Sequence, residues 1–399
     1  MSINYRLYRP SDLEPTLALV NQIFQVENPK IPLAAWEKLE AGDHVTVLAE
    51  DAGRIVGAIP YDLRTFALRP GHSIRAAFAH CVGVAADYRA AGVGSGMMAH
   101  AKQALKPYCD GLFVYTSGEG HAPYTFYQRN GFVDLHYSRT YTLTEFTGEG
   151  DPAIEITPLN PATLDGAALY AIYREAYPVQ GGFPVREPSY WQRAFASIIY
   201  VQIPCAFYLA RAHVDGQLAG YGLFAYNARG AHMPRGVYIL ELAAPARYPG
   251  LAEHLLRAII AAAPSLGAQA VSMQASGAHP ALPDLLKLGF QAAPRAQATV
   301  VAGQLLDLDK AWAALADGRE APALHLWTPQ RQLDLPGSGP AITLEMKEET
   351  LQRLFLCRED PATALRDERI TSPAGLLPVP ALQALFQPAP WVHHGLDWI

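Results

Sequence analysis

The sequence predicts a mixed α/β and α+β protein of three consecutive domains, and three observations lead to this fold class. Residues 82–105 read as a short apolar strand, a glycine-containing turn and a helix, which is a unit of α/β architecture. The landmarks of this unit return 158 residues later, as they would in a duplicated domain. The last hundred residues instead alternate short strands with short helices. We therefore expect domains at residues 1–151, 152–300 and 301–399.

Length and composition are those of an ordinary globular protein. The 399 residues suffice for two or three domains with cores of their own. A net charge of −6 without a basic cluster argues against a nucleic-acid partner and is compatible with cationic small molecules. The first residues do not resemble a signal peptide and no apolar run reaches the length of a membrane span, so we expect a cytoplasmic protein without membrane contact. The four cysteines lack C-x-x-C spacing, which argues against a disulfide framework or a zinc site.

The first domain is expected to contain a strand, two helices and a hairpin before the glycine-containing unit. The hairpin is indicated by the turn residues Asp51-Ala52-Gly53 between two strand-like runs. The helix after the glycines places apolar side chains on one face, those of Met97, Met98, Ala101 and Leu105. Strands are expected at residues 5–8, 45–50, 54–61, 78–84 and 111–115, and helices at residues 13–24, 32–39 and 95–105, followed by the segment at residues 124–132.

The turn before this helix has the character of an anion site. Gly92 and Gly94 let the backbone approach a ligand closely, and a helix N-terminus offers unpaired N–H groups with partial positive charge. The pattern is neither Walker A nor the dinucleotide fingerprint. It reads Arg-x-x-Gly-x-Gly from Arg89, preceded by Val-x-Val at Val82 and Val84. The alternative is an ordinary strand-to-helix turn marked by glycines.

This pattern resembles the acetyl-coenzyme A loop of the GNAT acetyltransferases, and the expected order of elements is also that of the GNAT fold. The resemblance implies that the strand backbone binds the pantetheine arm and that the loop amides bind the pyrophosphate. The residues that it assigns to acetyl-CoA are Val82, Gly83, Val84, Arg89, Ala90, Ala91, Gly92, Val93, Gly94 and Ser95.

Acetyl transfer to an amine requires a positioned thioester, a deprotonated amine and a proton for the leaving thiolate. In the GNAT pattern a Tyr lies four residues before the Gly of a Gly-aromatic pair, and here Tyr127 precedes Gly131-Phe132 in that register. Tyr127 is therefore the candidate general acid. Tyr124 would share its helix face and is the second choice.

The second domain repeats the first but lacks its chemistry. The five landmarks at Val82, Val84, Arg89, Gly92 and Gly131 return at Leu240, Leu242, Arg247, Gly250 and Gly289. Ala252 replaces Gly94, Leu285 replaces Tyr127, and Pro249 replaces Ala91, which removes one N–H from the cradle. We interpret residues 152–300 as a degenerate GNAT domain, and the alternative is a second active site.

The last domain has strand patterns at residues 323–328, 331–335 and 341–346 and helix patterns at 348–356, 361–366 and 380–386. It resembles the fold of sterol carrier protein type two by pattern alone. Two GNAT domains followed by such a domain resemble the enhanced-intracellular-survival (Eis) acetyltransferases over the whole chain. That resemblance implies a hexamer that acetylates amines of aminoglycosides and of some lysine-containing substrates.

In Eis proteins the chain's terminal carboxylate enters the active site as general base, and the resemblance assigns this role to Ile399. The preceding residues are aromatic and apolar, as in a docked terminus, although a tail that packs only for stability or oligomer contact would look the same. Described Eis members often end in Phe, so the side chain differs here. His80 is the alternative base because of its ordinary pKa. His393 and His394 lack a third ligand in register, so we expect no metal.

The Eis resemblance also suggests which residues contact the acceptor amine: Phe24, Glu27 and Trp36 in the helical pair, with Cys81 at a pocket position. Acidic and aromatic groups would suit a polyamine or an aminoglycoside, but they equally suit a plain amphipathic surface. The sequence thus predicts an acetyl-CoA-dependent N-acetyltransferase acting on a primary amine of a cationic small molecule or a lysine-type substrate. The alternatives are a GNAT enzyme for a peptide or protein amine, and a non-catalytic acyl-CoA- or lipid-binding protein.

Overall fold

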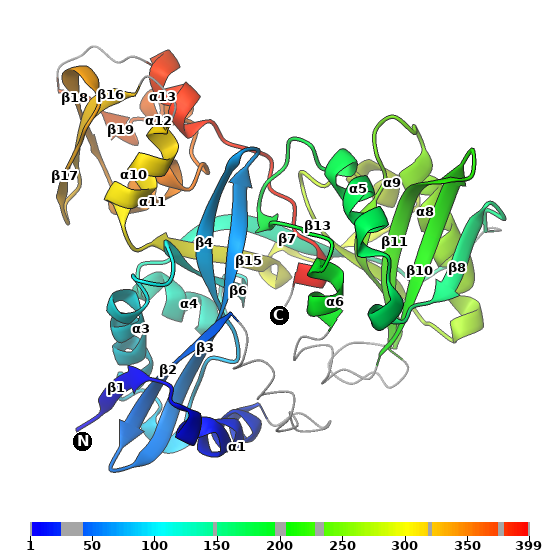
Figure 1. The fold of residues 1–399 in the computed structure, drawn as a ribbon, viewed down its shortest axis with the longest axis horizontal. Helices are drawn as coiled ribbons and strands as arrows, with labels where there is room; N and C mark the ends of the chain where they lie inside the picture. Colours follow the sequence, from blue (N-terminus) through cyan, green and yellow to red (C-terminus); the bar gives the residue numbers. More distant parts are fainter. Residues whose placement is uncertain are drawn as a thin grey trace.

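A computed structural model describes residues 2–24, 43–146, 150–195, 205–227, 235–317, 321–373 and 379–397 of the chain. Within these residues, fifteen strands join one mixed sheet and four more form a separate small sheet. Figure 1 shows the large sheet passing through the N-terminal and middle parts of the chain, with the small sheet and its helices above the N-terminal part. None of the described helices is long and apolar enough to cross a membrane.

The N-terminal part follows the predicted order of elements, with the strand β7 in addition. Its strands are β1 (Asn4–Leu7), β2 (His44–Asp51), β3 (Arg54–Arg69), β4 (His72–Ala79), β5 (Gly83–Val84), β6 (Gly111–Ser117) and β7 (Val133–Leu143). Its helices are α1 (Leu13–Ile23), α3 (Val93–Ala104) and α4 (Ala122–Arg129). The four apolar side chains predicted on one face of α3 are all buried, because that face packs on the sheet. The helix expected at residues 32–39 lies outside the described residues.

The strand predicted at residues 78–84 is wrong in one respect, because it is broken in the middle. β4 ends at Ala79 and β5 begins at Gly83, and between them Cys81 has a left-handed backbone with φ of 46°. β4 pairs in parallel with β6 up to Ala79 opposite Val114, whereas β5 pairs with β3. β5 therefore diverges from β6, and its outer edge is free of strand pairing among the described residues.

The middle part repeats this architecture. Its strands are β8 (Ile154–Pro158), β9 (Phe183–Pro184), β10 (Cys205–Val214), β11 (Gln217–Asn227), β12 (Gly236–Ala243), β13 (Val271–Ser276) and β14 (Gln291–Ala292). Its helices are α5 (Gly166–Ala176), α6 (Tyr190–Phe195), α8 (Leu251–Ala262) and α9 (Leu282–Lys287). The repeat is confirmed by the backbone: Gly92 and Gly250 have φ of 79° and 80° at the starts of α3 and α8, and Gly131 and Gly289 have φ of 80° and 90°.

The two repeats share their sheet, because β15 (Thr299–Leu305) lies between β6 and β7 and pairs antiparallel with both. β7 in turn pairs with β13 of the middle part. The predicted boundary near residue 300 thus falls inside a strand of the shared sheet, while the one near residue 151 falls between β7 and β8. The division into three domains stays a prediction.

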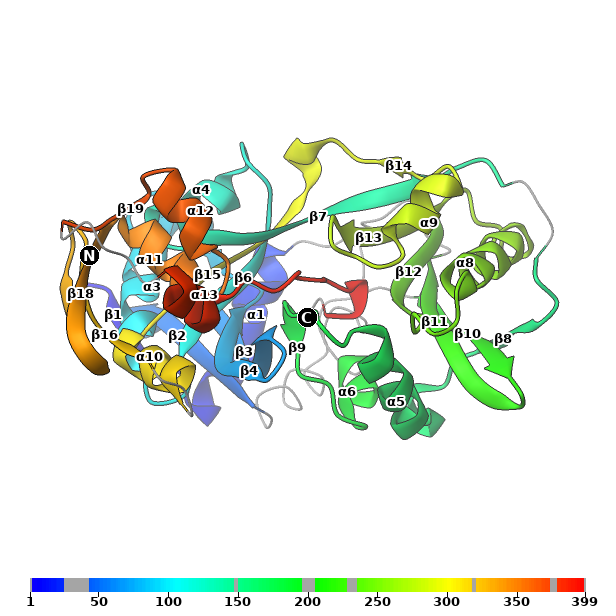
Figure 2. The same cartoon turned by 90° about the horizontal axis from the view of Figure 1, so that it is seen from above.

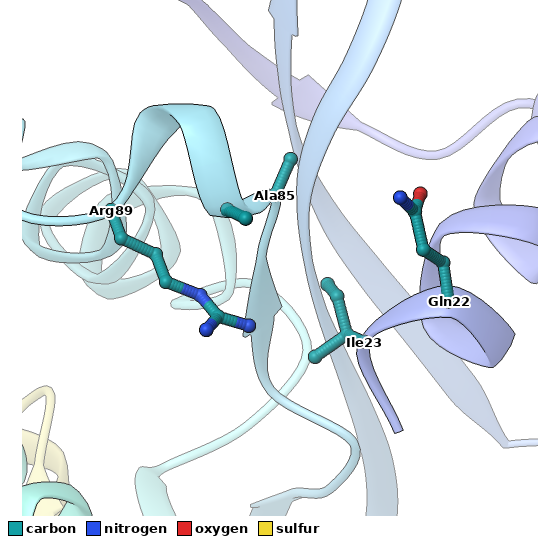
Figure 3. A pocket seen from close by; sticks show the side chains of 5 residues that line it. Gln22, Ile23, Ala85 and Arg89 are labelled. Atoms are coloured by element: carbon teal, nitrogen blue, oxygen red, sulfur yellow. The ribbon is translucent and has the colours of Figure 1, made fainter. Parts of the chain in front are cut away.

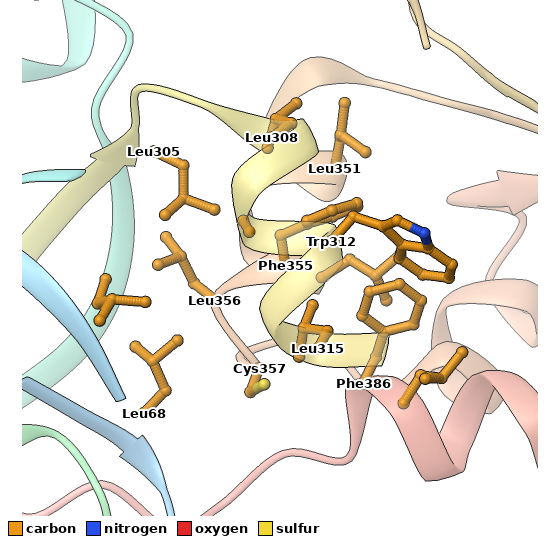
Figure 4. Close-up of a cluster of buried hydrophobic side chains, with 14 of the residues drawn as sticks. Leu68, Leu305, Leu308, Trp312, Leu315, Leu351, Phe355, Leu356, Cys357 and Phe386 are labelled. Atoms are coloured by element: carbon orange, nitrogen blue, oxygen red, sulfur yellow. The ribbon is translucent and has the colours of Figure 1, made fainter. Parts of the chain in front are cut away.

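The C-terminal part has the predicted strands and helices, together with one strand and one helix that were not predicted. The predicted elements are β16 (Pro322–Trp327), β17 (Gln332–Leu335), β18 (Ser338–Met346), α11 (Glu348–Phe355), α12 (Pro361–Arg366) and α13 (Val379–Phe386), and the additional ones are β19 (Ile370–Thr371) and α10 (Leu308–Ala316). Figure 4 shows Trp312, Phe355 and Phe386 packed together between these helices, with Leu68 of β3 nearby. One hydrophobic core therefore joins the C-terminal part to the N-terminal sheet.

After α13 the chain returns to the middle of the molecule, and residues 390–397 are here called the C-terminal segment. Figure 2 shows it running between the N-terminal and middle parts. Trp391 donates its indole N–H to the Leu68 carbonyl at 2.8 Å, Val392 donates to the Gly181 carbonyl at 2.9 Å, and Asp397 is fully buried. The chain is thus docked up to Asp397. Trp398 and Ile399 lie outside the described residues.

Candidate active site

The start of α3 has the features that an anion site requires. Gly92 precedes the helix in a left-handed conformation, and no side chain caps the N-terminus. The first helical bond joins the Gly96 N–H to the Gly92 carbonyl at 2.9 Å, so the preceding amides of the first turn have no intrahelical acceptor. Ala90 has φ of 62°, a conformation that L-residues adopt at a cost and that is common at ligand-binding loops. Residues 89–92 and Ser95 are exposed, so the loop is open to a phosphate.

A cavity of about 290 Å³ lies beside this loop, between the end of α1 and β5 (Figure 3). It is lined by Gln22, Ile23, Ala85, Ala86 and Arg89. The Arg89 Nε donates to the Val84 carbonyl at 3.3 Å, a long and exposed contact that a ligand can replace. The strand edge, the loop and the cavity are therefore contiguous, as a ligand with an extended arm and an anionic group would need.

Helix α4, which carries Tyr127, packs against α3. A Cβ at Gly94 would lie 3.1 Å from the Phe126 ring, so the glycine allows α4 to pack closely on α3. Asn130, which follows α4, links it to α3 by donating a hydrogen bond to the Ser95 hydroxyl at 3.3 Å. The Tyr127 side chain is only 5% exposed, and burial raises the pKa of its phenol, which therefore stays protonated at neutral pH.

Tyr124 has a different environment on the same helix. Its hydroxyl donates to Asp134 Oδ2 at 2.6 Å, and Tyr137 donates to the same oxygen. Burial and the bond to Asp134 raise the pKa of Tyr124. Its proton is thus engaged with a carboxylate, whereas the Tyr127 ring packs between aromatic side chains.

The strand break places His80 and Cys81 side by side. His80 Nε2 lies 3.1 Å from His44 Nε2. Burial, together with His44 and Arg64, lowers the pKa of His80 well below its ordinary range, so the ring is neutral at pH 7. Burial raises the pKa of the Cys81 thiol to about 12, so Cys81 can form a pocket wall but not a nucleophilic thiolate.

The C-terminal segment ends close to this region. Arg64 Nη1 on β3 donates to the Asp397 carbonyl at 3.1 Å. Arg64 lies three residues after Tyr61, whose partner Ala79 is the last residue of β4, so the backbone of Arg64 is roughly 10 Å along the strand from the break. Ile399, the predicted base, follows two residues later and lies outside the described residues.

The remaining predicted residues form two groups, the proposed acceptor contacts and the two adjacent histidines near the C-terminus. Phe24 follows α1 next to the cavity wall and is 38% exposed, while Glu27 and Trp36 lie outside the described residues. His393 and His394 are buried, and burial lowers their pKa values to about 4 and about 3. His394 Nε2 is hydrogen-bonded at 3.2 Å to the hydroxyl of Tyr173 in the middle part. No three His, Cys, Asp or Glu side chains in the described part of the chain are grouped so that they could share a metal.

The equivalent region of the repeat is filled by the chain itself. β13 pairs with β12 only from Val237 to Ile239, so the later half of β12 diverges as β5 does. There, however, the Tyr177 hydroxyl donates to the carbonyl of Leu242, the counterpart of Val84. Gly395 of the C-terminal segment packs against Leu240, the counterpart of Val82. Sequence reasoning gave no sign of this contact.

Comparison with known proteins identifies the class to which this geometry belongs. Residues 4–133 match the family described as acetyltransferase (GNAT) domain. The chain thus has an N-acetyltransferase domain at its N-terminus, and its fold is the mixed α/β GNAT fold.

Solved structures extend the likeness of fold to the rest of the chain. A GCN5-related N-acetyltransferase from Anabaena variabilis has a TM-score of 0.71 at 14% identity, covering 98% of this chain and 99% of that chain. Eis1 from Mycobacterium abscessus has a TM-score of 0.59 at 15% identity, covering 99% of both chains. A tandem GNAT protein from the clavulanic acid biosynthesis pathway has a TM-score of 0.51 at 14% identity, covering 77% of this chain and 99% of that chain. No curated protein matches the sequence.

Proposed function

We propose that this protein is an acetyl-CoA-dependent N-acetyltransferase with one active site per chain. The acceptor is a primary amine of a cationic small molecule, such as an aminoglycoside or a polyamine, or of a lysine-type substrate. The observation that carries the proposal is the presence, within one GNAT acetyltransferase domain, of a free strand edge at β5, an open anion cradle at α3 and a buried phenol on α4, the helix that packs on α3.

Acetyl-CoA would lie along β5 with its pyrophosphate on the loop. The backbone of Val82 and Val84 offers the polar groups of a strand edge to the amide-containing arm. The amides from Ala90 to Ser95 would receive the pyrophosphate, and the helix dipole of α3 adds positive potential there. Arg89 adds a charged donor beside the cavity.

The chemistry requires two proton transfers. The amine nitrogen attacks the thioester carbon, a C–N bond forms, the C–S bond breaks, and the thiolate takes a proton from the Tyr127 phenol. The nitrogen becomes acidic once it is bonded to the carbonyl carbon, so a carboxylate suffices to accept its proton. We propose the chain's terminal carboxylate at Ile399 for this role, and the buried position of Asp397 supports it. The low pKa of His80 makes this histidine the weaker candidate.

The nature of the acceptor follows from charge and from the cavity. The net charge of −6 favours a cationic substrate. Phe24 stands exposed beside the cavity, where an aromatic ring can contact an ammonium group.

The hexamer and the sterol-carrier-like fold of the C-terminal part are further proposals from the Eis resemblance. Sedimentation velocity tests the first, with a particle of six chains as the expected result.

The test of the proposed function is thiol release from acetyl-CoA in the presence of aminoglycosides, polyamines or lysine peptides. We expect turnover that depends on the amine and falls at least tenfold in Tyr127→Phe, because general acid catalysis contributes roughly 10²–10⁴-fold. Tyr108→Phe, at an exposed tyrosine outside the site, is the control and keeps full turnover. Loss in Tyr124→Phe but not in Tyr127→Phe would transfer the role of acid to Tyr124. Tight acetyl-CoA binding without turnover on any amine would instead indicate an acyl-CoA-binding protein.

A further inference from the structure

The C-terminal segment occupies the part of the middle domain that corresponds to the proposed acetyl-CoA site. Gly395 packs against Leu240, so that a Cβ there would lie 3.4 Å from the Leu240 Cα. Val392 and Leu396 belong to the hydrophobic core of this domain, and His394 packs on Tyr173 and Tyr177. The space between the diverging strands β12 and β13 is therefore filled by a segment of the same chain.

A buried ionic network fixes the end of this segment. Arg186 Nη2 lies 2.7 Å from Asp397 Oδ1 and 2.8 Å from Glu241 Oε2. The Tyr190 hydroxyl donates to Asp397 Oδ1 at 2.5 Å, and the Tyr221 hydroxyl donates to Glu241 Oε1 at 2.7 Å. All five side chains are buried, so the carboxylates depend on these partners for their solvation.

The N-terminal part also binds Asp397. Arg64 on β3 donates to the backbone carbonyl of Asp397, and its guanidinium also pairs with Asp62. Asp397 is thus bound by its main chain to the domain with the proposed active site and by its carboxylate to the middle domain. This double attachment fixes both the position and the direction of the chain at this point.

We propose that the middle domain acts as the receptor of the C-terminal segment, and that Arg186 and Tyr190 are positioning residues that set the chain end relative to the active site. The inference rests on the proposed function, since it concerns the position of the carboxylate proposed as base. It gives the degenerate repeat a role: its cleft binds a peptide of its own chain where the N-terminal copy binds acetyl-CoA.

Two mild variants test this in the full-length protein. Asp397→Asn removes the charge but leaves the Arg186–Glu241 pair, and Tyr190→Phe removes one hydroxyl from Asp397. Tyr221→Phe is the matched control, because it removes a buried hydroxyl from the other carboxylate of the network without touching Asp397. We expect kcat to fall at least tenfold in the first two variants, with the KM for the amine and the Kd for acetyl-CoA within twofold of wild type. In Tyr221→Phe, kcat, the KM for the amine and the Kd for acetyl-CoA should all stay within twofold of wild type.

Hydrogen exchange at residues 391–397 provides a readout independent of turnover. We expect faster exchange there in Asp397→Asn and Tyr190→Phe than in Tyr221→Phe. Faster exchange with an unchanged kcat would overturn the positioning role while leaving the proposed function intact. An equal fall of kcat in all three variants would overturn it too, since the effect would then be general destabilisation. If wild type itself turns over no amine, the proposed function fails and the positioning role fails with it. Unchanged hydrogen exchange at residues 391–397 in Asp397→Asn and Tyr190→Phe would refute the receptor role.

Discussion

Arg186→Met should destabilise the protein strongly, because it removes the cation between two buried carboxylates. Arg186 is 3% exposed, lies within 2.8 Å of both Glu241 and Asp397, and its guanidinium stands 3.8 Å from the ring centre of Tyr190. Removing one partner of a buried ion pair costs about 3–5 kcal/mol. The melting temperature changes by about 2–4 °C per kcal/mol for a unit of about 150–250 residues. The melting temperature of the unfolding transition that includes the middle part of the chain should therefore fall by about 6–20 °C.

Thermal unfolding followed by circular dichroism measures this shift. The matched control is Arg193→Met, which breaks the exposed pair between Arg193 and Glu187 and should cost at most about 1 kcal/mol. Adding Glu241→Gln and Asp397→Asn to Arg186→Met should restore at least half of the loss, because no uncompensated carboxylate remains. Equal shifts for Arg186→Met and Arg193→Met, or no recovery in the triple variant, would refute the reasoning.

The difference in stability between wild type and Arg186→Met should depend on pH. Burial alone would raise the pKa of Asp397, but Arg186 and the neighbouring histidines lower it below its ordinary value. In wild type its contribution to stability is therefore present above the unfolded pKa, near 4, and is lost as pH falls through that range. Without Arg186, burial raises the folded pKa, so the penalty is relieved as pH falls. The gap in melting temperature should narrow between pH 7 and pH 5, and a constant or wider gap would contradict this explanation.

Three further predictions concern the proposed acetyl-CoA site. Gly83→Ala places a Cβ 2.6 Å from Ile23 Cδ1 and should cost about 1–3 kcal/mol of stability and weaken acetyl-CoA binding in calorimetry. Gly277→Ala, with open space around its Cβ, is the control, and equal losses in both would contradict the packing argument. Gly94→Ala should raise the Kd for acetyl-CoA several-fold, because helix α4 must shift away from the cradle; an unchanged Kd would show that the cradle does not bind the cofactor. The half-buried Cys81 thiol, with a pKa of about 12, should resist iodoacetamide at pH 7.5 in the folded protein, and rapid labelling detected by mass spectrometry would contradict its raised pKa.

Local patterns in the sequence predicted the helix and the turn of the site well. The apolar face of α3, the glycine at its start and the 158-residue repeat all depend on spacing along the chain, and each appears in the structure. Helix α10 could also have been predicted. Asp307 caps it by accepting from the Lys310 N–H at 3.0 Å, and Leu308, Trp312 and Leu315 have helical spacing.

The features that were missed depend on contacts between distant residues or on backbone angles. The strand break at Cys81 lies in a continuous apolar run, and nothing in side-chain periodicity reports a positive φ. β15 enters the sheet between β6 and β7 by pairing across more than 150 residues, for which no local pattern exists. The network of Arg186, Glu241 and Asp397 likewise has no spacing motif. Such residues are visible only once the fold brings them together.

The most direct test of the central claim is an acetyl-CoA titration of the full chain combined with thiol release in the same sample. One active site per chain predicts one acetyl-CoA bound per chain, and thiol released only after a primary amine is added. Two acetyl-CoA molecules bound per chain would contradict a single active site per chain. Binding elsewhere than the α3 cradle, seen as an unchanged Kd in Gly94→Ala, or the absence of amine-dependent thiol release, would contradict the proposed enzyme.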